Sequence, residues 1–183
     1  MRLLFLSICI ILILSSCGSS KPRVITTKKE QGKIIRDKQD AKDTDKVVFV
    51  EKSKPAKIAS NITNEALRFK GTPYKFGGTT KRGMDCSGLI YTAFQKEDIN
   101  LPRTSRAMSL QGTRLSLRDL SEGDLLFFET NKNKKVINHV GLVVGFNDDD
   151  VLFIHSTSSR GVIVSNFSER YWRDAFVMAR RVL

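Results

Sequence analysis

The sequence predicts an α+β domain in which N-terminal helices pack on a small antiparallel β-sheet. Two observations support this class. Apolar residues recur at helical spacing between residues 58 and 96, whereas after Gly112 the chain changes to short β-rich runs separated by turn residues. Helices followed by strands are typical of α+β domains. The 183 residues, 40% of them hydrophobic, suffice for one domain with appendages and exclude a wholly disordered chain.

The first residues have the features of an export signal. Arg2 precedes an apolar run from Leu3 to Leu14, which is too short to span a bilayer. Leu14-Ser15-Ser16-Cys17 then resembles the lipobox of bacterial lipoproteins, which implies that Cys17 carries lipid at the mature N-terminus. We therefore expect a signal peptide at residues 1–16 and a membrane anchor at Cys17, with a plain secretory signal as the alternative.

Residues 17–60 are expected to form a flexible basic tether between the lipid and the domain. Between residues 18 and 60 there are twelve Lys and Arg against six Asp and Glu, and no hydrophobic period is sustained. A flexible chain of this length reaches on the order of 35–40 Å. The charge suits an anionic lipid or polymer, and a solvated linker without a binding role is the alternative.

Three helices are expected in the first half of the domain. The first has Asn61 as its N-terminal cap and a stripe of apolar residues, and Gly71-Thr72-Pro73 ends it. Residues 77–85 are predicted as a loop. The second helix runs from Cys86 to Lys96 with Asp85 at its N-cap, and a shorter one runs from Ser105 to about Gln111. The apolar stripe of the first helix is Ile58, Ile62, Ala66 and Phe69.

Five strands are expected in the second half, and they would form the sheet. The run of turn residues from Gly145 to Asp150 connects two of these strands and predicts a hairpin. The strands are Asp124–Thr130, Val136–Gly145, Val151–Ser156, Gly161–Asn166 and Phe176–Leu183.

Cys86 is the one cysteine expected to be free in the mature protein. Cys9 leaves with the signal, Cys17 carries lipid, and no CxxC pair is present to hold zinc. Cys86 begins a predicted helix, where unpaired N–H groups and the helix dipole favour a thiolate and can stabilise an oxyanion. We expect a nucleophile whose pKa is lowered, and an inert buried cysteine is the alternative.

His139 and His155 are the only two histidines, and they lie on the two strands of the predicted hairpin. If the hairpin is centred on Asn147, the two face each other with Cβ atoms about 5 Å apart. A thiol nucleophile needs a base, and the base needs an orienting partner. A zinc site built from Cys86 and the two histidines is the alternative. Because no short-spaced ligand pair anchors such a site, we expect no metal and no cofactor.

Five motifs resemble the NlpC family of cell-wall cysteine peptidases, and they occur in the family's order over residues 61–183. The set is more specific than any single motif. The motifs are Pro73-Tyr74-Lys75-Phe76-Gly77-Gly78, Asp85-Cys86-Ser87-Gly88-Leu89, Leu101-Pro102-Arg103-Thr104-Ser105, Gly123-Asp124-Leu125-Leu126-Phe127-Phe128 and His139-Val140-Gly141.

The resemblance implies a papain-like α+β fold and a Cys-His-polar triad. Cys86 would be the nucleophile, His139 the base and His155 the third member. Tyr74 would lie near the nucleophile and help the oxyanion hole. Asp85 and Ser87 would flank the site and contact polar groups of the substrate. One residue departs from the family pattern, because many members have Trp where this chain has Phe76.

The resemblance also implies a function. We expect a monomeric cysteine endopeptidase, anchored to a membrane of the cell envelope, that hydrolyses amide bonds in peptidoglycan stem peptides or crosslinks. An amidase or acyltransferase with the same triad, or a non-catalytic wall-binding lipoprotein, is the alternative. The domain carries eighteen Lys and Arg against thirteen Asp and Glu, which suits an anionic polymer. The net charge of +12 alone suggests nucleic acid, but the export signal and the absence of a nucleic-acid motif argue against it.

Overall fold

The computed structural model describes residues 53–131, 133–148 and 150–183. The predicted signal peptide, Cys17 and the tether up to residue 52 lie outside the described residues. The helices are α1 (Lys54–Leu67), α2 (Cys86–Gln95), α3 (Ser105–Met108), the 3₁₀ helix η1 (Leu117–Asp119) and α4 (Arg170–Ala175). The strands are β1 (Thr79–Thr80), β2 (Gly83–Met84), β3 (Thr113–Leu115), β4 (Leu125–Phe128), β5 (His139–Asn147), β6 (Asp150–Thr157), β7 (Gly161–Asn166) and β8 (Phe176–Arg181).

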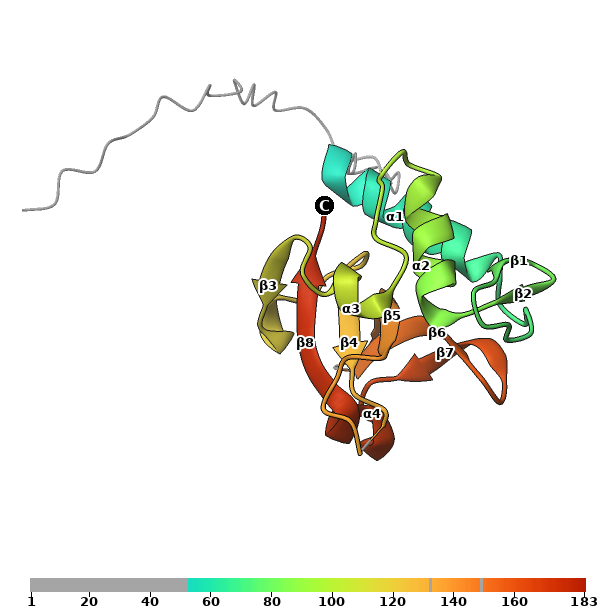
Figure 1. Cartoon of the computed structure of the whole chain (residues 1–183). Helices are drawn as coiled ribbons and strands as arrows, with labels where there is room; N and C mark the ends of the chain where they lie inside the picture. The colour runs from blue at the N-terminus through green and yellow to red at the C-terminus, as the bar shows by residue number, and fades with distance from the viewer. Residues whose placement is uncertain (1–52, 132, 149) are drawn as a thin grey trace, which may run out of the picture. The chain divides into compact units, whose positions relative to one another are not determined.

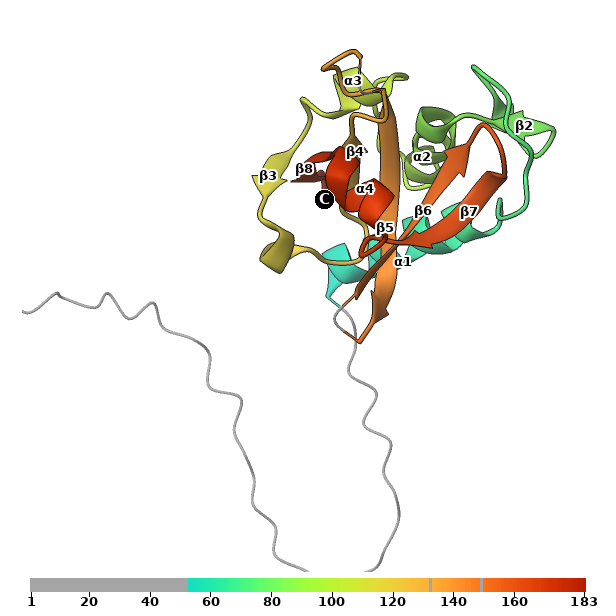
Figure 2. The ribbon, with the colours of Figure 1, turned by 90° about the horizontal axis from the view of Figure 1, so that it is seen from below.

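Six of these strands form one antiparallel sheet in the order β3-β8-β4-β5-β6-β7, and β1 and β2 pair separately. Helices α1 and α2 lie side by side (Figure 1), and α2 packs against β5 and β6 (Figure 2). The sequence predicts an arrangement in which helices come first along the chain and an antiparallel sheet follows. The structure has this arrangement, so the α+β class is confirmed.

The sheet is buried on both faces, as the side chains of strand β4 show. All four of its residues are buried, and successive side chains point to opposite faces. Leu125 and Phe127 join the large apolar cluster that contains α1 and α2, whereas Leu126 and Phe128 join a second cluster with Trp172 of α4. A strand covered on both faces is expected to be apolar throughout, which explains the run Leu-Leu-Phe-Phe.

Helix α1 begins earlier than the sequence analysis predicts. It starts at Lys54, with Pro55 in its first turn, where a missing N–H costs nothing. Asn61 therefore lies inside the helix, and its side-chain amide donates to Glu97 at 3.0 Å, so the predicted cap is wrong. Residues 54–60, assigned above to the tether, are helical.

Helix α2 agrees closely with the prediction, since it runs from Cys86 to Gln95. Asp85 is its N-cap, and Oδ1 of this residue accepts from the backbone N–H of Gly88 at 2.6 Å. This capping bond fixes the first turn of α2 and with it the position of Cys86.

The predicted hairpin exists, but its register is wrong by three residues next to the turn and by two residues beyond the bulge, where the histidines lie. Asn147 pairs with Asp150, and Leu142 pairs with Ile154, so His155 is not directly opposite His139. The turn is shifted because Asp148 takes the left-handed conformation, with φ of 51°, and a bulge follows Val143. Since the shift is even, the two histidines still lie on the same face of the sheet.

Several short elements were not predicted. They are the β1–β2 pair inside the predicted loop, strand β3, helix η1 and helix α4. Each is too short to show a period in the sequence. In the part of the chain that the structure describes, no helix has both the length and the apolar character needed to cross a bilayer.

Candidate active site

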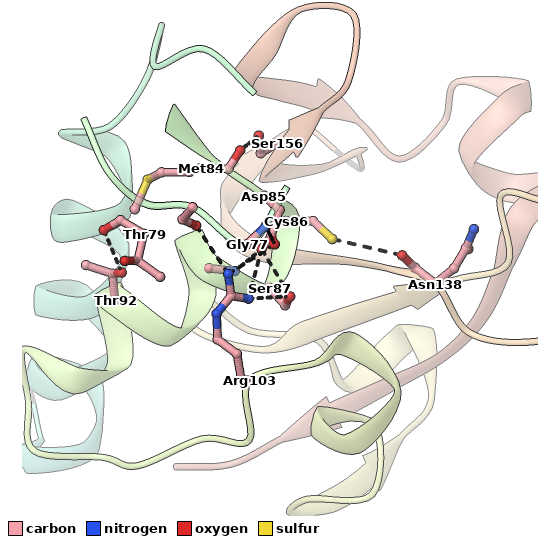
Figure 3. A network of polar contacts seen from close by, with 12 residues as sticks. Gly77, Thr79, Met84, Asp85, Cys86, Ser87, Thr92, Arg103, Asn138 and Ser156 are labelled. Carbon is pink, nitrogen blue, oxygen red and sulfur yellow. Dashed lines mark hydrogen bonds and ion pairs between the residues drawn. The ribbon is translucent and has the colours of Figure 1, made fainter. Parts of the chain in front are cut away.

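Cys86 lies where the start of α2 meets the start of β5. Its Sγ is 4.0 Å from the carbonyl oxygen of Asn138, the residue before His139 (Figure 3). Cys86 and His139 line the same cavity, with a volume of about 230 Å³, which we call the histidine-side cavity. The nucleophile and base proposed from the sequence are therefore brought to one opening by elements 53 residues apart in the chain.

The Cys86 thiol is protonated in the resting site. Burial raises its pKa above the ordinary value of 9.0, and the charge of Asp85 adds to the rise. Hydrogen bonds from the backbone N–H groups of Val140, Ser87 and Cys86 oppose this but do not outweigh it. The lowered pKa expected for a cysteine at a helix start is therefore wrong here, because desolvation exceeds the effect of the N–H groups.

His139 and His155 are in direct contact despite the shifted register. His139 Nε2 lies 3.0 Å from His155 Nδ1, and His155 Nε2 lies 3.0 Å from the hydroxyl oxygen of Ser165. Both rings are enclosed by aromatic side chains. Trp172 stacks on His139, and Phe153 stacks on His155. The two rings and Ser165 thus form one buried chain of hydrogen bonds.

Gly141 leaves the room that this packing needs. A Cβ atom at this position would lie 2.4 Å from the ring of Phe153, the ring that stacks on His155. Any side chain at Gly141 would displace that ring and, with it, the face on which His155 rests.

Burial keeps both histidines neutral. Desolvation lowers the pKa of His139 from 6.5 to about 4. Desolvation also lowers the pKa of His155 to about 2, with further contributions from the charges of His139 and Arg160. At neutral pH the site therefore holds a neutral thiol and two neutral imidazoles.

Arg103 forms a charged network behind the nucleophile (Figure 3). Its guanidinium binds both carboxylate oxygens of Asp85, at 2.9 and 3.0 Å, and also donates to Ser87 Oγ at 2.9 Å and to the Gly78 carbonyl at 3.3 Å. Asp85 also accepts from the N–H of Gly77 at 2.7 Å. Asp85 thus ties the start of α2 to the 77–78 loop and to Arg103.

This network explains why a glycine stands at position 88, two residues after Cys86. A Cβ atom at Gly88 would lie 2.1 Å from the Gly78 carbonyl oxygen and 2.9 Å from the Arg103 guanidinium. Because one contact is to backbone, no side-chain movement would relieve it. The glycine permits the loop and the ion pair to approach the first turn of α2.

The network lowers the pKa of Asp85 below its usual 3.8. Burial alone would raise it, but hydrogen bonds from Arg103, Gly88 and Gly77 and the charge of Arg103 outweigh burial. A carboxyl whose folded-state pKa is depressed stabilises the fold above its unfolded-state pKa and loses that contribution as pH falls through the folded-state value.

We therefore expect Asp85→Asn to lower the free energy of unfolding by about 2 kcal/mol at pH 7, because Arg103 loses its buried counterion. The difference from the parent protein should shrink as pH falls below 3.8 and through the lower folded-state pKa of Asp85, where the parent carboxyl also becomes neutral. Thermal denaturation at pH 7 and at pH 3 measures both. Asp174→Asn is the matched control, since this carboxylate is 63% exposed in its pair with Arg170. Equal destabilisation by the two variants would contradict the prediction.

A second cavity of about 440 Å³ lies on the other side of Cys86, and we call it the arginine-side cavity. Tyr74, Cys86 and Asn138 line both cavities. The arginine-side cavity has the charged groups Asp85 and Arg103, whereas the histidine-side cavity has hydroxyls, an amide and aromatic rings but no carboxylate, Lys or Arg. Cys86 therefore lies at the middle of an extended opening.

Exposed aromatic rings flank this opening at both ends. Phe76, at the edge of the arginine-side cavity, is 87% exposed, and Tyr171, in the histidine-side cavity, is 55% exposed. Tyr74 lies between them, and burial together with the charges of Cys86 and Asp85 raises the pKa of its hydroxyl. The Tyr74 hydroxyl is thus a neutral hydrogen-bond donor beside the thiol.

Three residues around the site were not identified from the sequence as functional. Arg103 stands in one of the quoted motifs, and its partner Asp85 was identified from the sequence. A buried carboxylate needs a cation as its partner, and this requirement is the signal that could have identified Arg103. Ser165 and Trp172 gave no signal, because only the fold brings β7 and α4 to the histidines. Across residues 53–131, 133–148 and 150–183, no group of three or more acidic, His or Cys side chains is placed to hold a metal ion.

Comparison with known proteins decides the family. The NlpC/P60 family profile matches residues 71–181, which include every site residue described above. The chain belongs to the NlpC/P60 family. The predicted family is confirmed by this match.

Two curated relatives are named as endopeptidases, one of them a murein endopeptidase. The chain is 36% identical over 126 residues to the probable endopeptidase NlpC of Escherichia coli K12, covering 68% of this chain and 79% of the relative. It is 35% identical over 127 residues to the murein DD-endopeptidase MepS/murein LD-carboxypeptidase of the same strain, covering 69% and 64%. The match thus spans slightly less than two thirds of MepS.

A solved structure supports the fold. An NlpC/P60 family protein from Bacillus cereus superposes with a TM-score of 0.62 at 31% identity, covering 68% of this chain and 40% of that one. The papain-like α+β fold predicted for this chain is confirmed by this likeness.

Proposed function

We propose that this NlpC/P60 protein is a cysteine endopeptidase that hydrolyses amide bonds in peptidoglycan stem peptides or crosslinks. The observation that carries the proposal is one geometry: Cys86 and His139 line one cavity, and His139 is hydrogen-bonded to His155 on its far side. This is the order nucleophile, base, orienting group that acyl transfer needs. The names of both curated relatives support an endopeptidase, and the name of MepS supports murein as the substrate.

Acylation begins from the neutral pair. Because Nε2 of His139 is bonded to His155, Nδ1 is the ring nitrogen left for the thiol. In the proposed mechanism Nδ1 takes the thiol proton as Sγ attacks the carbonyl carbon, and a C–S bond forms. The resulting oxyanion accepts hydrogen bonds from the Cys86 backbone N–H and the Tyr74 hydroxyl. His139 then gives its proton to the leaving amine, the C–N bond breaks, and a thioester remains.

Deacylation uses the same groups in reverse. His139 takes a proton from water, which attacks the thioester carbon, and the proton returns to Sγ as the C–S bond breaks. His155 accepts the Nε2–H of His139 throughout and fixes the orientation of its ring. Trp172 and the neighbouring aromatic rings exclude water from this hydrogen bond, which strengthens it.

The two cavities support one direction for the substrate in this proposal. His139 lines only the histidine-side cavity, and it must reach the leaving amine, so the amine side of the cut bond would occupy that cavity. The acyl side would then occupy the arginine-side cavity next to Asp85 and Arg103. Ser87 and Asp85 are already bonded to Arg103, so in this proposal they act on the substrate through the network.

The protein's place in the cell is part of the proposal. We propose that residues 1–16 are removed, that Cys17 is lipidated, and that a monomeric domain acts on the wall within reach of its tether in the cell envelope. The export features of the first residues and the relatives named for murein support this. Mass spectrometry of the protein would detect the lipid, and fractionation would show the membrane that holds it and whether the protein is a monomer.

Digestion of defined muropeptides separates this function from its rivals. We expect the full-length protein to release two peptide products whose masses sum to that of the substrate plus one water. An amidase would release free glycan, an acyltransferase would yield a product heavier than the substrate, and a wall-binding protein would leave the mass unchanged. Liquid chromatography with mass spectrometry identifies the bond, and any of these three outcomes would overturn the proposed endopeptidase.

A further inference from the structure

Ser165 ends the buried chain of hydrogen bonds that starts at His139. It lies on β7, is 6% exposed, and its hydroxyl oxygen is 3.0 Å from His155 Nε2. Nothing in the family motifs quoted above includes this residue. Its hydroxyl contacts Nε2 of His155, the ring nitrogen that is not bonded to His139. The hydroxyl can therefore determine which nitrogen of His155 carries the proton.

The chain has two orientations, and only one of them suits catalysis. In the first, His155 donates Nε2–H to Ser165 and accepts at Nδ1 the Nε2–H of His139, which leaves His139 Nδ1 without a proton. In the second, Ser165 donates to His155, His155 donates to His139, and His139 carries its proton on Nδ1. A neutral His139 in the second orientation cannot take the thiol proton at Nδ1.

We infer that Ser165 is a positioning residue that accepts the His155 Nε2–H and thereby holds both histidines in the first orientation. This inference rests on the proposed function of His139 as the base. It requires no covalent step at Ser165, because the serine oxygen acts only as a hydrogen-bond acceptor.

The surroundings of His155 make an acceptor at this position important. The charged or titratable groups that act on His155 are His139 and Arg160, and both oppose a positive charge on it. Phe153 and Trp172 cover its ring faces. Among the described residues, no carboxylate is hydrogen-bonded to His155 to select its tautomer. The serine hydroxyl therefore takes the place that an acid fills in other relays.

The first test measures the tautomers directly, without a substrate. The chain has only two histidines, so nitrogen-15 labelling of histidine in the full-length protein, without a histidine tag, gives a long-range proton–nitrogen spectrum of two imidazoles. We expect both rings to carry the proton on Nε2 at neutral pH, and a His155→Gln variant assigns the signals. A proton on Nδ1 of either ring would overturn the inference, even if the muropeptide bond proves different from the one proposed.

The second test measures rate. Ser165→Ala is expected to lower kcat by about 10-fold with KM nearly unchanged, because the orientation of the base is lost and substrate contacts are not. Ser165→Thr keeps the hydroxyl and should restore most of kcat. Ser109→Ala is the matched control, since Ser109 is also buried but donates to the Arg106 carbonyl in α3. A Ser165→Ala variant with unchanged kcat would overturn the inference.

Discussion

Cys86→Ala is expected to reduce peptide release from purified sacculi by at least about 10³-fold. The reason is that no other nucleophile is available in the opening: the hydroxyls around it belong to Ser, Thr and Tyr side chains that have no hydrogen bond to His139. Alanine removes only the sulfur atom from a partly buried position, so the capping of α2 by Asp85 should survive. Release of soluble muropeptides, followed by chromatography, gives the rate.

The variant must remain folded for this result to carry meaning. The melting temperature of Cys86→Ala should lie close to that of the parent, and Ser109→Ala provides an active protein with a buried change at the C-cap of α3. A Cys86→Ala protein that still releases muropeptides at the parent rate would refute the assignment of the nucleophile. A folded variant that fails to release them supports it.

His139→Ala is expected to lower turnover by about 10²–10⁴-fold, since it removes the group that takes and returns the proton. The parent enzyme should also show an unusual pH profile. Activity requires neutral His139, whose pKa is about 4, so kcat/KM should rise with pH through about 4 and then stay level through pH 6.5. A histidine with an ordinary pKa would instead give a rise centred near 6.5.

The comparison variant is His155→Gln, which keeps Cys86 and His139 and retains a polar group beside the base. Its loss of turnover should be smaller than that of His139→Ala. Circular dichroism at each pH separates loss of activity from acid unfolding, to which Asp85 contributes below pH 3.8. A rise in parent activity centred near pH 6.5 would contradict the low pKa that burial gives to His139.

The features that the sequence analysis predicted correctly are those with a local signal. Asp85 followed by an apolar stripe marks the start of α2, and strand Gly161–Asn166 matches the structure at both ends. The roles proposed for Cys86 and His139 came from motif and rarity, since the chain has only two histidines, and these roles stay predictions. Each of these signals lies within a few residues of the feature it predicts.

The features that were missed depend on contacts between distant segments. Four consecutive turn-forming residues follow Phe146, and the sequence does not indicate which of them adopts the left-handed conformation. The predicted hairpin register was therefore wrong. Ser165 and Arg103 are separated from their partners by 10 and 18 residues, and no period connects them. The raised pKa of Cys86 reflects how deeply the fold buries it, which helix position alone does not reveal.

The protonated state of Cys86 bears on the chemical durability of the protein. Thiolates attack peroxides and disulfides far faster than thiols do, so a cysteine whose raised pKa keeps it uncharged until a substrate arrives would be protected from sulfenic acid formation. If the protein is exported as proposed, Cys86, the free cysteine among the described residues, would otherwise be exposed to the oxidants of the cell's surroundings. Delaying ionisation until the moment of attack would thus lower the rate of attack and lengthen the time for which the thiol stays reduced.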